Sequence, residues 1–215
     1  MILIAGVARE GSTQSTAQID STSVTAASSP QREAPQNWAF SLSAAENIVA
    51  QGQNYIQPTF TADRDWLHLE GRYNNEGLNT ASLWVGYNLS GGKEVQLAIT
   101  PLFGVVFGDV RGIAPGYELT LNWHKLQLYS EAEYLLAGIN SSDNDFYSTS
   151  TLMISPFKGI QIGAIAQRTQ ISHTNLALDR GPIINFEYGE YDLSFYVLNL
   201  DRSDSTYVGS LGISF

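Results

Sequence analysis

From Trp38 to the end of the chain, apolar and polar residues alternate with a period of two. The clearest segments are residues 38–44, 82–89 and 117–123. Successive side chains of a β-strand point to opposite faces of the sheet. Each segment therefore predicts a strand with one apolar face and one mostly polar face. Helical periodicity is not evident in any stretch of this region.

Tight turns between these segments give each hairpin a predicted register. The predicted turns are at residues 64–65, 90–92, 124–125 and 189–190. The first turn places Thr59 opposite Glu70. The second, where glycines can adopt a positive φ, places Val85 opposite Leu97. In every hairpin apolar residues then face apolar ones and polar residues face polar ones, and a slip of one residue would destroy these matches.

Longer polar connections alternate with the short turns, which describes an up-and-down meander closed on itself. They lie near residues 74–78, 109–115, 140–145, 172–181 and 201–205. The count gives about 12 strands, with 10 as the alternative, and roughly 15 residues for each strand with its connection, which suits membrane strands of about 9–11 residues. An even number of strands puts both chain ends on the short-turn side.

Composition excludes several other classes of protein. The longest internal apolar run, residues 101–108, is far shorter than the roughly 20 residues of a spanning helix. The formal net charge of −10 argues against nucleic acid as a partner. The absence of cysteine removes disulfides, thiolate metal sites and cysteine nucleophiles.

Residues 1–37 differ in composition from the rest of the chain. The first eight residues are apolar and end in a small residue, so we interpret them as the remainder of a secretory signal. The segment up to Asn37 contains no aromatic residue and is rich in Ser, Thr, Ala and Gln. Such a segment buries too little apolar surface to offset its ordering entropy. The sequence thus predicts a disordered periplasmic segment at 1–37, followed by one domain at 38–215.

The last predicted strand, residues 207–215, ends in Phe215, with Tyr207, Leu211 and Ile213 on the same face. This arrangement resembles the C-terminal signature of bacterial outer-membrane β-barrel proteins of the porin-like kind, in which the barrel-insertion machinery recognises a terminal aromatic strand. Through the hairpin pattern the resemblance extends over residues 38–215. It implies an all-β, transmembrane antiparallel up-and-down β-barrel in the bacterial outer membrane, in contact with its lipids and with both termini periplasmic. These residues identify no specific functional family.

Aromatic residues near the strand ends favour a membrane barrel over a soluble β-protein. They resemble the interfacial girdles of membrane barrels, and they are Trp38, Tyr73, Tyr87, Trp123, Tyr188 and Phe215. If the apolar face contacts lipid, the polar face lines the lumen. The predicted lumen or pore-lining residues are Glu70, Arg72, Glu118, Glu131, Glu133, Glu187 and Asp192. The same phase also points Glu94 and Lys125 inward.

Three of these acids come together near the predicted middle of the membrane. The turn at 124–125 places Glu118 directly opposite Glu131, with Glu133 about 7 Å further along the same face. Facing like charges destabilise a sheet unless something compensates them. The compensation expected is a cation such as Arg72 or Arg168, lumen water, or a shared proton.

These features predict a narrow passive pore for cations or small polar solutes. The alternative is a structural or adhesion barrel with a plugged lumen, and a lipid-modifying enzyme is a third hypothesis. The candidate catalytic histidines are His68, His124 and His173, and none of them lies in a recognised hydrolase motif. Residues 140–145 lack the spacing of a calcium loop. The sequence therefore predicts no catalytic residue, metal or cofactor.

Overall fold

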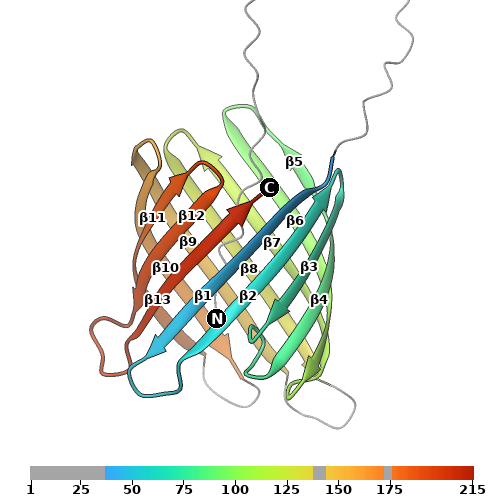
Figure 1. The fold of residues 1–215 in the computed structure, drawn as a ribbon, viewed down its shortest axis with the longest axis vertical. Helices are drawn as coiled ribbons and strands as arrows, with labels where there is room; N and C mark the ends of the chain where they lie inside the picture. Colours follow the sequence, from blue (N-terminus) through green and yellow to red (C-terminus); the bar gives the residue numbers. More distant parts are fainter. Residues whose placement is uncertain (1–36, 138–143, 172–175) are drawn as a thin grey trace, which may run out of the picture.

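The computed structural model describes residues 37–137, 144–171 and 176–215. Figure 1 shows one closed sheet of tilted strands. The strands of its first half are β1 (Ala39–Val49), β2 (Tyr55–Arg64), β3 (Leu67–Tyr73), β4 (Thr80–Tyr87), β5 (Leu89–Gly91), β6 (Val95–Gly108) and β7 (Gly112–Trp123). Those of its second half are β8 (Leu126–Ala137), β9 (Asp145–Phe157), β10 (Ile160–Gln170), β11 (Ala177–Tyr188), β12 (Tyr191–Leu198) and β13 (Thr206–Ser214).

The strands form a twelve-stranded antiparallel barrel. Strands β4 and β5 both pair with β6 in one continuous register, so they are two parts of one strand interrupted at Asn88. Every other strand pairs with its sequence neighbour, and β1 pairs with β13 to close the sheet. The predicted fold class and strand count are therefore confirmed. Apart from Asn37, the segment predicted at 1–37 lies outside the described residues.

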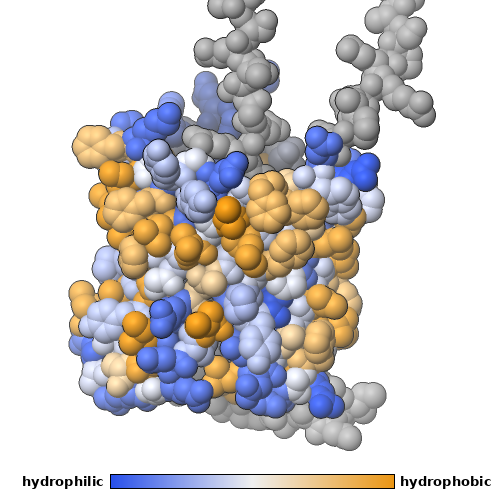
Figure 2. Space-filling view, viewed as in Figure 1, coloured by the Kyte–Doolittle hydropathy of each residue, from blue (hydrophilic) through white to orange (hydrophobic). Residues whose placement is uncertain are grey.

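The barrel is apolar outside and polar inside, the reverse of a soluble protein. On β4, Leu83 is 62% exposed whereas its neighbour Ser82 is 1% exposed, and Gln57 of β2 is fully buried in the interior. Figure 2 shows apolar side chains over much of one outer face, with hydrophilic ones gathered toward its two ends. Exposed Leu, Ile, Val and Phe on successive strands form the lipid-facing belt of a membrane barrel. Among the described residues, no helix is long and apolar enough to cross a membrane.

Two of the four predicted hairpin registers are confirmed. The turns at 124–125 and 189–190 give the expected partners throughout, including the Glu118–Glu131 pair. The turn predicted at 64–65 is wrong by one position, because Asp65 adopts the left-handed conformation, with φ 52°, and the turn is at 65–66. Thr59 accordingly pairs with Arg72 instead of Glu70.

The hairpin predicted at 90–92 is also longer than expected. Val85 pairs with Phe103 instead of Leu97, because the strand continues through β5 before it turns. Gly92 allows the later turn: its φ is 107°, and a Cβ there would lie 1.9 Å from the carbonyl oxygen of Val95. Both errors shift the pairing by an even number of residues, so every side chain stays on its predicted face.

Aromatic stacking reinforces the seam where the two ends of the barrel meet. Phe40 of β1 and Phe215 exchange two backbone hydrogen bonds, of 2.8 and 2.9 Å. The Phe40 ring stacks on Trp38, Phe60 and Phe215, with centroid distances of 5.8 to 6.1 Å. These rings join β1, β2 and the end of β13 on the outer face near the rim that carries both chain ends.

We expect Phe40→Ala to destabilise the barrel more than removal of a phenylalanine elsewhere on the lipid face. Each aromatic pair contributes about 0.5–1.5 kcal/mol beyond its buried area, so the loss should exceed that of Phe103→Ala by about 2 kcal/mol. Urea unfolding in lipid vesicles, followed by heat-modifiable migration on gels, measures the difference. Equal losses for the two variants would show that stacking adds nothing to the seam.

Candidate functional site

Arg72 of β3 is buried in the lumen and connects two distant parts of the wall. Its guanidinium donates hydrogen bonds to Glu131 (2.9 Å) and Glu133 (3.1 Å) of β8, and to Glu70 of its own strand (2.8 Å). Strands β4, β6 and β7 separate β3 from β8 in the sheet. The ion pairs therefore cross the interior of the barrel instead of running along its wall.

The facing acids predicted in the lumen are brought together here. Glu118 of β7 pairs with Glu131 of β8 in the observed register. Arg72 lies between the acids, with its Nη2 atom 3.9 Å from Glu118. Of the two cations considered as compensation, Arg72 takes this place, whereas Arg168 is exposed on the outer side of β10. We call Arg72 with Glu70, Glu118, Glu131 and Glu133 the Arg72 cluster.

A loop residue that the strand pattern did not reveal adds a further acid. Glu76, in the connection between β3 and β4, is 1% exposed and accepts a hydrogen bond of 2.6 Å from Ser82. Ser82 in turn accepts one of 2.9 Å from the Trp84 indole. The Arg72 guanidinium lies over the Trp84 ring in a cation–π contact, with its Cζ atom 4.7 Å from the ring centroid. This loop thus folds inward and closes one side of the Arg72 cluster.

His68 lies beside the Arg72 cluster on β3, facing Asp63 of β2 in the sheet. Its Nδ1 atom is 2.8 Å from the Asp63 carboxylate, which also accepts a hydrogen bond from Asn88. Thr100 of β6 donates to Asn88 in turn. The register predicted from a turn at 64–65 would pair His68 with Thr61, so the sequence did not reveal Asp63 as its partner.

The remaining predicted lumen residues do not join this cluster. Glu187 and Asp192 face one another on β11 and β12, where Asp192 accepts a hydrogen bond of 2.8 Å from Asn185. Glu187 is exposed, near the turn at 189–190. Glu94 and Lys125 are exposed residues in turns at the short-turn rim, away from the Arg72 cluster.

Apolar side chains fill part of the lumen, although the pattern predicted a polar interior. One buried cluster combines Ala45, Met153, Ile165, Ile183, Tyr196, Leu198 and Val208. A second combines Trp84, Leu102, Val106, Ala114 and Leu135. The first joins β1 with β9–β13, and the second joins β4 with β6, β7 and β8. The open cross-section is therefore narrower than the strand count alone suggests.

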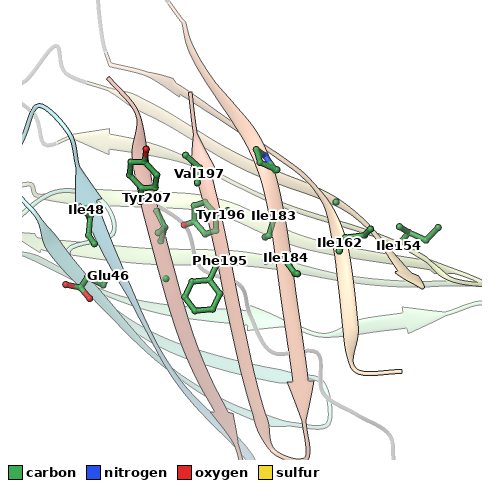
Figure 3. Close-up of a pocket in the computed structure, with 14 residues that line it drawn as sticks. Glu46, Ile48, Ile154, Ile162, Ile183, Ile184, Phe195, Tyr196, Val197 and Tyr207 are labelled. Atoms are coloured by element: carbon green, nitrogen blue, oxygen red, sulfur yellow. The ribbon is translucent and has the colours of Figure 1, made fainter. Parts of the chain in front are cut away.

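The outer wall carries an apolar groove of about 840 Å³ over β1 and β9–β13. Figure 3 shows Phe195 and Tyr207 on neighbouring strands, with Glu46 and Ile48 on β1 beside them. Phe195, Tyr207 and Ile48 are each about half exposed on the lipid-facing side. This groove therefore faces acyl chains, and it is not part of a passage through the barrel.

The residues of the predicted insertion signal lie along the outer face of the seam. Tyr207, Leu211 and Phe215 are exposed, and Ile213 is partly exposed. All four lie on or directly after β13, the strand that closes the barrel against β1. Their role in insertion stays a prediction.

The fold is similar to that of solved porins. The KdgM porin in complex with disordered oligogalacturonate matches with a TM-score of 0.61 and 11% identity, over 81% of this chain and 99% of that chain. The NanC porin matches with a TM-score of 0.54 and 11% identity, over 82% of this chain and 98% of that chain. No family model and no curated protein sequence matches the chain. The likeness to these structures shows a β-barrel of the porin fold, and the exposed apolar belt is that of a membrane barrel.

Removal of the Arg72 charge is expected to destabilise the barrel strongly. In Arg72→Met, three buried carboxylates lose their common donor, and breaking a buried pair from one side costs about 3–5 kcal/mol. The matched variant Arg168→Met removes an exposed cation and should change the free energy of unfolding little. Urea titration of both in lipid vesicles tests this difference. Acidification should partly restore the stability of Arg72→Met, since protonation removes the repulsion between the carboxylates. Equal stability of Arg72→Met and Arg168→Met would contradict the role of Arg72.

Proposed function

We propose that this barrel is a narrow passive pore of the outer membrane for cations or small polar solutes. The observation that carries the proposal is the excess of acid around Arg72. Glu70, Glu76, Glu118, Glu131 and Glu133 lie in the interior with one guanidinium among them. Within a low-dielectric wall, such a charge excess concentrates cations and repels anions.

The acidic interior also bears on the class of solute. The KdgM structure contains oligogalacturonate, a chain of sugar acids. A constriction with several carboxylates and one arginine would repel such a polyanion. We therefore do not extend the oligogalacturonate ligand of that porin to this chain.

A plugged structural or adhesion barrel is the second candidate, and it has its own supporting observation. The hydrogen bonds of Arg72 cross the lumen from β3 to β8. The apolar cluster that contains Met153, Ile183 and Tyr196 packs within the same barrel. Both groups occupy space in the lumen, as a plugged barrel requires. Conductance separates the two candidates.

Single-channel recording in planar bilayers is the test of the pore. We expect cation-selective current steps from the wild-type protein. Glu118→Gln combined with Glu131→Gln should lower the cation-to-anion permeability ratio several-fold, because it removes facing charges from the lumen. Glu46→Gln is the matched control, since it removes a carboxylate from the outer wall and should leave selectivity unchanged. A complete absence of conductance would exclude the pore and favour the plugged barrel.

We do not assign an enzymatic role to the barrel. The His68 ring is engaged with Asp63 and faces Glu70, and the KdgM and NanC structures that the fold resembles are porins. A lipid-modifying activity would require a nucleophile or an activated water at the lipid face. Incubation of the folded protein with phospholipid and lipid A tests for a lipid-modifying enzyme. We expect no cleaved product.

The exposed row on β13 supports recognition by the barrel-insertion machinery from the periplasmic side. Tyr207, Leu211 and Phe215 lie on one face of the strand that closes the barrel. The start of β1 and the end of β13 lie at the short-turn rim (Figure 1), and we propose that this rim faces the periplasm.

Phe215→Ser should therefore reduce the amount of folded barrel in the outer membrane several-fold. Tyr188→Ser, which removes an exposed aromatic from another turn at the same rim, should not. Gel migration of membrane fractions without heating measures the folded protein. Equal amounts of the two variants would argue against a terminal signal, and Phe215→Tyr should restore assembly.

A further inference from the structure

Three buried polar atoms in the lumen lack a hydrogen-bond partner within the described part of the chain. His68 Nε2, Glu70 Oε1 and Glu118 Oε1 have no hydrogen-bond partner among the described residues. His68, Glu70 and Glu118 each offer one ligand atom within 4.8 Å of those of the other two. Buried polar atoms without partners are rare in folded proteins. A buried imidazole nitrogen without a partner, next to two glutamates that also have unpartnered oxygens, indicates a shared ligand.

The orientation of His68 fits a ligand at this point. A carboxylate only accepts hydrogen bonds, so Asp63 fixes the proton on Nδ1 at 2.8 Å. The Nε2 lone pair then faces Glu70, 3.6 Å from the Oε2 atom that also accepts a hydrogen bond from Arg72. A carboxylate behind a histidine is the usual arrangement that orients imidazole toward a metal ion. Asp63 is itself held by Asn88.

Charge points to the same kind of ligand. Arg72 already engages one oxygen of Glu70 and the carboxylates of Glu131 and Glu133. It lies 3.9 Å from Glu118, beyond hydrogen-bonding distance. One guanidinium therefore leaves negative charge uncompensated on the His68 side of the Arg72 cluster. A dication bound there would neutralise it and satisfy the three atoms together.

We propose that His68, Glu70 and Glu118 bind one divalent transition-metal ion of the Zn²⁺ class, with Asp63 as a positioning residue. Imidazole together with carboxylates suits such ions, whereas Mg²⁺ and Ca²⁺ prefer oxygen ligands alone. Four-coordinate zinc at about 2.0–2.2 Å from its ligands places the ligand atoms roughly 3.4 Å apart. Rotation of the two glutamate side chains would close the observed spacing of up to 4.8 Å.

The bound ion would connect β3 to β7 across the two strands that separate them. It would also lower the negative charge of the constriction. The proposed site does not require that the lumen conducts, because binding is measured on the folded barrel in detergent. A failed conductance experiment and a failed binding experiment are therefore separate results.

Calorimetric titration of Zn²⁺ into the full chain, folded in micelles and free of any histidine tag, tests the site. We expect one ion per barrel. His68→Gln and Glu118→Gln should each weaken binding at least tenfold, and Asp63→Asn about 10–100-fold. His124→Gln and Glu46→Gln remove the same groups from an exposed turn and from the outer wall, and they should leave affinity unchanged. Gel migration without heating confirms that each variant is folded.

X-ray absorption of the wild-type zinc complex supplies a measurement that needs no variant. The expected shell contains one imidazole nitrogen, with oxygen atoms as the other ligands. Three results would overturn the proposal: no stoichiometric zinc binding, zinc binding that His68→Gln leaves unchanged, or Ca²⁺ binding as tight as that of Zn²⁺. The first would mean that His68 is a protonated imidazolium held between Asp63 and Glu70, and the last would indicate a cluster of acids without metal selectivity.

Discussion

The structure depends on one constraint: inside a membrane, each backbone N–H and C=O group must find its partner within the protein. A sheet satisfies this only when its first and last strands pair, because a free edge would expose a row of unpaired groups to lipid. The contact of β1 with β13 therefore decides whether the other strand pairings can exist in a bilayer. Aromatic rings gather around Phe40 at this seam, so side-chain packing supports the step that completes the backbone network.

Closure also creates an interior that lipid cannot reach, where charged side chains become possible and need partners. Arg72 is such a partner, because it donates hydrogen bonds to three acids on two strands that are not neighbours. The same contacts that make the acids tolerable also narrow the passage. Stability and permeability are therefore opposed in this lumen: each group that neutralises charge also occupies space.

Much of this architecture follows from the sequence, for a physical reason. Alternation with a period of two determines which face a residue occupies, and the apolar face must contact lipid, so Glu70, Arg72, Glu118, Glu131 and Glu133 could be placed inward. Alternation does not distinguish registers that differ by two residues. The hairpin that contains Asp65 was for this reason assigned the wrong partners but the correct faces.

What the sequence did not reveal depends on loops and on distance across the lumen. Glu76 lies in a polar connection whose inward fold depends on its hydrogen bond with Ser82 of β4. The only local hint is that Asn74 and Asn79, at its ends, are of a residue type that tolerates the left-handed conformation they adopt. The contact of Arg72 with β8 joins residues about 60 positions apart, and no pairing rule between adjacent strands predicts it.

Glu46 has a consequence for how the barrel sits in its bilayer. It is an exposed carboxylate beside an apolar groove, three residues before β1 ends at Val49. A charge on the lipid side costs more the deeper it lies and little at the interface. Glu46 therefore limits how far this end of the wall can sink, while the aromatic rings around Phe40 mark the opposite boundary of the same strand. Together they set the vertical position of the barrel on one side, so its depth is defined by individual residues as well as by the height of the apolar belt.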